Sequence, residues 1–139
     1  MGVLVLTSVH HLYGAWRFAT PWRVHVAHIG VTFSAVLIAS LILAYTKRGF
    51  RIGRFGLWVF LLTTMVVCVL QFGIYEGGYN HLLKIILHWS GLPDSQWRAL
   101  YPASLYEPPE DFWFELTGVL QLPVALVAEK LCLHLHRAY

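Results

Sequence analysis

Three long runs of apolar residues dominate the pattern of hydrophobic and polar positions along the chain. The first covers residues 24–45, and the second covers residues 55–75 without a charged side chain. The third, residues 112–135, is weaker, because its uncharged centre covers only residues 116–128. About 20 apolar residues let an α-helix cross a hydrocarbon core of about 30 Å. The pattern predicts an all-α integral membrane protein with three transmembrane helices, with a buried or re-entrant segment as the alternative for the third.

A weaker helical pattern follows the second apolar run. Leu82, Leu83, Ile86 and Leu87 repeat at helical spacing after two consecutive glycines, with polar residues on the other face. We expect the second span to end near Tyr75 and the glycines to turn the chain. A short amphipathic helix over about residues 79–90 would then lie along the outer membrane surface.

The composition agrees with this membrane assignment. Hydrophobic residues make up 58% of the 139-residue chain and charged residues only 12%, against about 25% charged in a typical soluble domain. No residue range has a soluble composition, so residues 1–139 are expected to form a single membrane domain. Cys68 and Cys132 lie far apart in apolar runs without a CxxC motif, and we interpret them as small buried hydrophobic residues.

Basic residues predict the orientation of the spans. Lys47, Arg48, Arg51 and Arg54 all fall in the short loop between the first two spans, which predicts that this loop is cytoplasmic. The N-terminus and the loop from Glu76 to Asp111 would then lie outside, and the C-terminus would be cytoplasmic. Arg17 and Arg23 oppose this assignment and are outnumbered. The net charge of +3 reflects this loop asymmetry and gives no sign of nucleic-acid binding.

Residues 1–18 are too short and too often interrupted by polar residues to span the membrane. We expect them to lie at the interface or to fold against the bundle.

Four aromatic residues of the outer loop and the start of the third span are typical of an interfacial belt. These are Trp97, Tyr101, Tyr106 and Trp113.

Polar residues that can bind a metal gather at the outer level of this topology. His25 and His28 are one helical turn apart at the outer end of the first span, and Glu76 follows the second. His81 in the outer loop and Glu115 at the start of the third span complete the candidate ligand set. Imidazoles with carboxylates suit zinc, copper(II) or iron.

Three further histidines fall at the same level without being assigned as ligands. His10 and His11 are adjacent and would point in different directions on any regular structure. His88 belongs to the polar face of the expected surface helix. We interpret all three as surface or structural residues.

The functional hypothesis is a small membrane protein that binds a transition-metal ion for metal handling or redox chemistry. One alternative is a non-catalytic accessory subunit of a larger membrane complex, and another is a subunit that binds haem or a quinone. The expected partners are the lipid bilayer and either other membrane subunits or further copies of this chain. No nucleophile motif or phosphate-binding loop is present, so the sequence does not decide whether the protein is an enzyme.

Overall fold

The computed structural model describes residues 1–138, and these residues form helices and connecting loops without any strand. The N-terminal half contains α1 (Gly2–Arg17), η1 (Pro21–Arg23), α2 (Val24–Thr46) and α3 (Arg51–Thr63). The remainder contains η2 (Thr64–Leu83), α4 (Lys84–Trp89), α5 (Asp94–Leu100), α6 (Phe112–Val119) and α7 (Gln121–Ala138).

Three helices are long and apolar enough to cross a membrane, as the sequence predicted. They are the ranges Pro21–Thr46, Arg51–Trp89 and Phe112–Ala138. Many large apolar side chains on them are exposed, among them Val31, Leu62 and Leu131. Exposed apolar rows are the expected surface of a helix that faces lipid.

The second long helix differs from its predicted form. The expected turn at Gly77–Gly78 is absent, and one helix continues through α3, η2 and α4 to Trp89. The end predicted near Tyr75 is therefore wrong. Residues 79–89 are helical, but they continue the second span instead of forming a separate helix, and a position along the membrane surface stays unconfirmed. With 39 residues this helix is longer than the roughly 20 residues that cross a hydrocarbon core.

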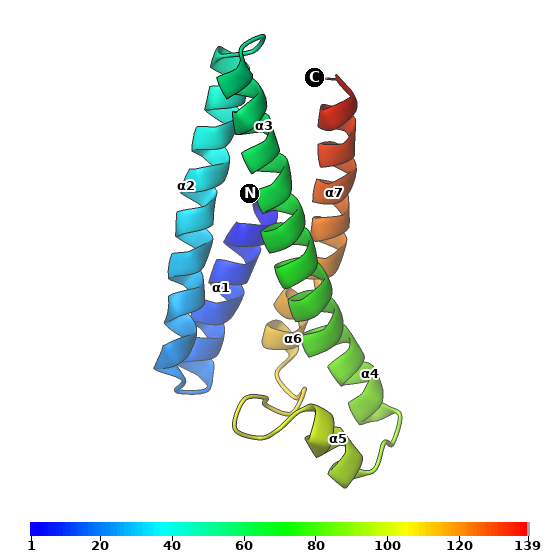
Figure 1. The fold of residues 1–139 in the computed structure, drawn as a ribbon. Helices are drawn as coiled ribbons and strands as arrows, with labels where there is room; N and C mark the ends of the chain where they lie inside the picture. Colours follow the sequence, from blue (N-terminus) through cyan, green and yellow to red (C-terminus); the bar gives the residue numbers. More distant parts are fainter. Residues whose placement is uncertain (139) are drawn as a thin grey trace.

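The helices form a bundle, and the connections between them lie at its two opposite ends (Figure 1). The loop after α2 and the end of α7 lie at one end, where the Arg48 side chain donates to the Ala138 carbonyl at 3.3 Å. The α1–α2 connection and α5 lie at the other end. The shorter α1 starts about midway along the bundle and packs against α2, α6, α7 and η2. Of the two placements considered for residues 1–18, folding against the bundle is correct.

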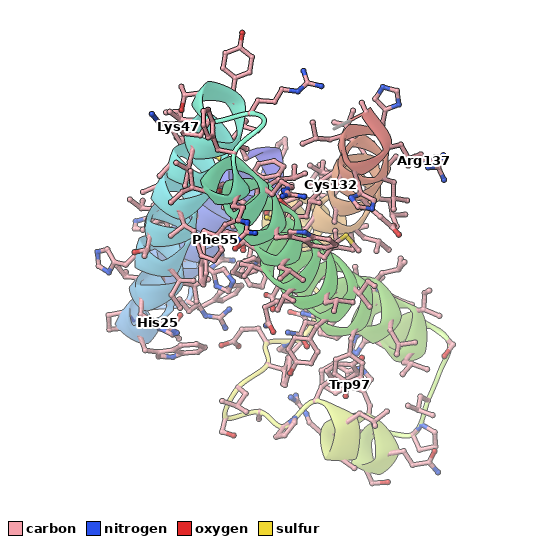
Figure 2. All side chains as sticks on the ribbon, turned by 45° about the horizontal axis from the view of Figure 1, so that its top comes forward. His25, Lys47, Phe55, Trp97, Cys132 and Arg137 are labelled. Atoms are coloured by element: carbon pink, nitrogen blue, oxygen red, sulfur yellow. The ribbon has the colours of Figure 1, made fainter. Side chains whose placement is uncertain are left out.

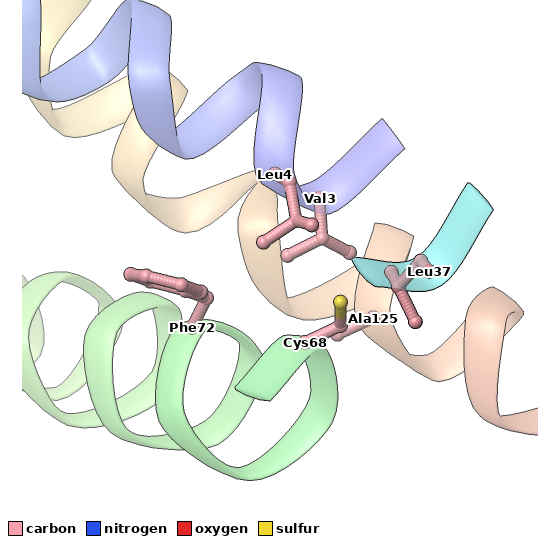
Figure 3. Packing of buried hydrophobic residues seen from close by; sticks show 6 residues of the cluster. All are labelled: Val3, Leu4, Leu37, Cys68, Phe72 and Ala125. Carbon is pink, nitrogen blue, oxygen red and sulfur yellow. The ribbon is translucent and has the colours of Figure 1, made fainter. Parts of the chain in front are cut away.

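The hydrophobic core lies where α1 meets the three long helices. Its buried cluster is made of Val3, Leu4, Leu37, Cys68, Phe72 and Ala125 (Figure 3). A second cluster nearer the C-terminus contains Ala44, Leu57, Leu61 and Cys132. Both cysteines are buried and unoxidised, which confirms their predicted role as small hydrophobic residues.

Residues 90–111, called the outer loop after their predicted side, fold back against the end of the second long helix. Tyr101 is fully buried and donates a hydrogen bond to the Tyr79 carbonyl at 2.9 Å. Trp97, also buried, contacts the Lys84 carbonyl through its indole N–H, and the Tyr106 hydroxyl donates to the Asn80 side chain. For Trp97 and Tyr101 the predicted interfacial belt is therefore wrong, because they anchor the loop to the helix end.

Candidate metal centre

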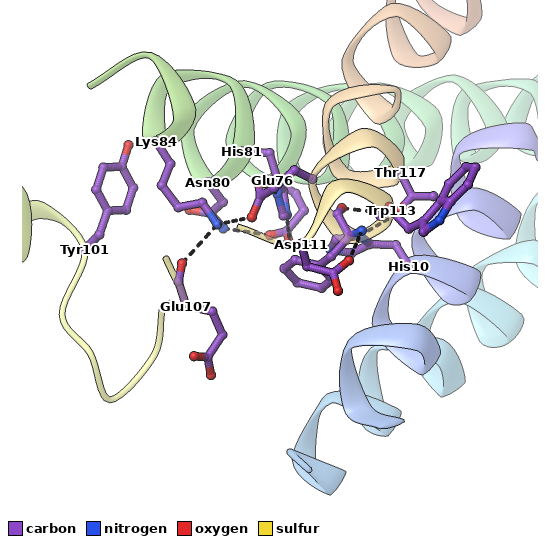
Figure 4. A network of polar contacts seen from close by, with 12 residues as sticks. His10, Glu76, Asn80, His81, Lys84, Tyr101, Glu107, Asp111, Trp113 and Thr117 are labelled. Atoms are coloured by element: carbon purple, nitrogen blue, oxygen red, sulfur yellow. Dashed lines mark hydrogen bonds and ion pairs between the residues drawn. The ribbon is translucent and has the colours of Figure 1, made fainter. Parts of the chain in front are cut away.

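Histidines and carboxylates from three helices meet at the loop-covered end of the bundle. α1 contributes His10 and His11, and η2 contributes Glu76 and His81. α6 contributes Glu115, which contacts His81. Figure 4 shows His10, Glu76 and His81 close to one another. These five side chains are called the outer cluster below. All are buried except Glu76, whose side chain is 13% exposed.

One carboxylate oxygen lies at the centre of the outer cluster. Oε1 of Glu76 is 3.8 Å from Nε2 of His10, 3.5 Å from Nε2 of His11 and 3.6 Å from Nε2 of His81. The ligand atoms of His10, Glu76 and His81 all lie within 4.8 Å of one another. This group can therefore hold a metal ion.

The outward-facing atoms of the same residues make shorter hydrogen bonds. Nδ1 of His10 is 3.0 Å from the Thr117 hydroxyl, and Nδ1 of His81 is 2.7 Å from Oε2 of Glu115. The Asn80 amide donates to the other Glu76 oxygen at 2.7 Å. Each bond fixes a ring or carboxylate so that the remaining nitrogen or oxygen faces the centre. Such outer partners commonly orient metal ligands.

A buried ion pair supports Glu115. The Lys84 ammonium lies 2.6 Å from Oε1 of Glu115 and also donates to the Glu107 carbonyl at 3.3 Å. Lys84 is 1% exposed, so its charge needs this partner. Glu115 thus has one oxygen on Lys84 and one on His81, and it acts as a support for the centre.

Burial favours the neutral form of both α1 histidines. Burial, the largest cause, lowers the pKa of His11 to about 4, although the Glu76 carboxylate opposes it. Burial also lowers the pKa of His10 well below its usual 6.5, and His81 and His11 add to that shift. A neutral imidazole is the form that binds a metal.

A cavity of about 230 Å³ opens beside the outer cluster. His11, Glu76 and His81 form part of its wall, and Tyr106 from the outer loop forms another part. Arg23 and Lys84 add two cations to the lining. A ligand can therefore reach the space next to Glu76 without unfolding the bundle.

Three of the five residues that the sequence nominated meet in the outer cluster, namely Glu76, His81 and Glu115. His25 and His28 do not join them, because both are exposed on α2. His25 forms part of the cavity wall, but its Nδ1 is hydrogen-bonded to the Trp22 carbonyl. Figure 2 shows it at the end of α2 away from Lys47.

Two residues of the outer cluster, His10 and His11, were not assigned as ligands from the sequence. The signal that reveals them is the spacing of Thr7, His10, His11 and Gly14, which all lie on the buried face of α1. This i, i+3, i+4, i+7 pattern marks one helix face. His10 and His11 share this face because they occupy its i+3 and i+4 positions.

Comparison of the chain with models of known protein families, with curated proteins and with solved structures gives no match. The functional argument therefore rests on the geometry of the outer cluster.

Proposed function

We propose that this chain is an integral membrane protein that binds one divalent transition-metal ion through His10, Glu76 and His81. The cavity beside His11 and Glu76 would give a further ligand access to this ion. Three protein ligands with one open position are typical of sites where a metal exchanges or activates a ligand, whereas structural zinc sites are closed. Metal handling or redox chemistry is the function that such a site supports.

The separation of the ligand atoms carries this proposal. The distances from Oε1 of Glu76 to the His10 and His81 nitrogens, 3.8 and 3.6 Å, are too long for hydrogen bonds. Two ligands at 2.0–2.2 Å from one ion, at angles of 109–120°, are roughly 3.3–3.8 Å apart. Nε2 of His10 is buried without any hydrogen-bond partner, which an ion at this point would supply.

The donor types favour zinc, iron or copper(II). Imidazole and carboxylate suit these ions, and neither cysteine lies in the outer cluster to favour copper(I) or an iron–sulfur centre. Haem is less well supported, because the His10 and His81 rings touch, with centroids 4.6 Å apart, and leave no room for a porphyrin between them. The exposed apolar faces of the long helices would contact lipid and either other membrane subunits or further copies of the chain.

Elemental analysis of the purified protein and its variants tests the proposal. We expect one metal ion per chain and no Soret band in the wild type, and loss of the metal in His10→Ala, Glu76→Gln and His81→Ala. His88→Ala is the matched control, because His88 lies on the same long helix as His81 and its ring contacts the rings of Trp89 and Trp97, outside the outer cluster. His28→Ala should also keep the metal. A metal-free wild type, or equal loss in His28→Ala, would contradict the proposal.

A further inference from the structure

Arg23 is a buried cation without a bound counter-charge. Its side chain is 6% exposed, and its Nε has no hydrogen-bond partner. Within residues 1–138 no carboxylate forms an ion pair with it, and its guanidinium carbon lies 4.9 Å from the Trp22 ring and 5.2 Å from the Phe114 ring. Aromatic faces compensate only part of the desolvation of a buried charge. An anion bound next to Arg23 would supply the missing counter-charge.

Arg23 faces the same cavity as the proposed metal centre. The cavity wall includes Arg23, Glu76 and His81. Lys84, the second cation of the wall, is already paired with Glu115 at 2.6 Å. Glu107 and Glu76 also line the cavity and act on Arg23 electrostatically, but within residues 1–138 neither lies close enough to form an ion pair with it. Arg23 is thus the wall residue that has positive charge to offer an incoming ligand.

We infer that this cavity binds a small monoanion, such as a short carboxylate, between Arg23 and the proposed metal ion. The contact of this ligand with the metal rests on the proposed function, and its contact with the protein rests on Arg23. The cavity volume of about 230 Å³ is below the roughly 300–1,000 Å³ of pockets that hold drug-sized ligands, so a small ligand fits it best. The planar guanidinium supplies paired donors that match a carboxylate.

The test uses cobalt(II) as the metal and azide as the monoanion, in the full chain purified in detergent. The visible spectrum of bound cobalt reports azide binding, and elemental analysis reports cobalt separately. We expect Arg23→Gln to bind cobalt and to weaken azide binding by about ten- to a hundredfold, the usual effect of removing a charged hydrogen-bond donor. Arg23→Lys keeps the charge but loses the fork, so it should weaken binding by a smaller factor.

Arg98→Gln is the matched control, because Arg98 also lies over an indole ring, at 4.7 Å from Trp97, and does not line this cavity. It should bind azide as the wild type does. Absence of cobalt from the wild type contradicts the metal proposal. Cobalt binding with no spectral response to azide, or with equal azide affinity in the wild type, Arg23→Lys and Arg23→Gln, overturns the anion site alone.

Discussion

At the scale of single residues, Gly118 determines whether His81 can reach the metal centre. A Cβ at this position would lie 2.3 Å from Cγ and 2.4 Å from Cδ2 of the His81 ring. No larger residue fits there while His81 keeps its position. The imidazole thus occupies the space that the glycine leaves on α6, between Glu115 and Glu76.

Gly118→Ala should therefore weaken metal binding without unfolding the protein. The methyl group moves the His81 ring away from Glu115, and disturbing such an outer partner typically costs about ten- to a hundredfold in metal affinity. Competition with a chelator of known affinity measures the change, and circular dichroism reports the helix content. Unchanged metal affinity in a folded variant would show that His81 is not a ligand.

Asp111 joins the start of α6 to α1. Its side chain accepts a hydrogen bond from the Phe114 N–H at 2.9 Å, which caps α6, and it pairs with Arg17 at 2.7 Å. Burial alone would raise its pKa, but the bonds from Phe114, Arg17 and Tyr13 outweigh this effect and lower the pKa below 3.8.

We expect Asp111→Ala to destabilise the protein by about 1 kcal/mol, the usual value of a lost N-cap. Asp111→Asn keeps a good cap and should cost less. Because the folded-state pKa is depressed, the charge contribution is present above pH 3.8 and disappears as the pH falls through the folded value. Thermal unfolding in detergent at pH 7 and below pH 3.8 measures both effects. A gap between wild type and Asp111→Asn that widens at low pH would contradict this assignment.

At the scale of helices, close packing explains Gly77, which the sequence pattern placed in a turn. A Cβ on Gly77 would lie 2.7 Å from the backbone nitrogen of Leu122, so Gly77 lets η2 approach α7 closely. Gly73, four residues earlier, faces Ala125 in the same way. Small residues four apart are a known device for close packing of membrane helices.

Gly77→Ala should destabilise the bundle by about 1–3 kcal/mol, because the inserted methyl group forces two helices apart. Gly78→Ala provides a control at the next position, where a Cβ would meet only the Gly73 carbonyl at 3.9 Å. It should stabilise the helix by about 0.5–1 kcal/mol, since alanine favours a helix more than glycine does. Reversible unfolding in mixed detergent compares the two. Equal effects would mean that Gly77 is not at a close contact.

Helix geometry also explains why the site was only partly predictable. Glu76 and His81 are five residues apart, which places them on different faces of an α-helix with 3.6 residues per turn. The η2 segment is π-helical, with i→i+5 turns, and this geometry brings both toward the same centre. Hydrophobic periodicity does not reveal a π-helix, and the two glycines instead predicted a turn that does not exist. His25 and His28 were nominated in place of the α1 histidines, because His10 and His11 were interpreted as surface or structural residues.

At the scale of the whole molecule, the long apolar runs made the three long apolar helices predictable, because runs of this length favour a helix. The starts of the first and third helices, Val24 and Phe112, agree with the predicted ranges. The packing of α1 and of the outer loop was not predictable, since neither carries a long apolar run. Both are held by particular contacts, such as Tyr101 to Tyr79.

The orientation of the molecule is a separate prediction. With the basic loop inside, a cysteine introduced as Ser95→Cys should react with an impermeant thiol reagent on intact cells. One introduced as Gly49→Cys should react only after the cells are lysed. Both positions are exposed, and the native cysteines are buried and should stay unlabelled. The reverse labelling pattern would place the metal centre on the cytoplasmic side.

The central claim is that the outer cluster binds one ion through two imidazoles and a carboxylate. X-ray absorption spectroscopy of the metal-loaded protein tests it most directly. We expect a first shell of nitrogen and oxygen at about 2.0–2.2 Å and an outer-shell signal from two imidazole rings. A sulfur shell near 2.3 Å, or a first shell without any imidazole signal, would contradict the claim.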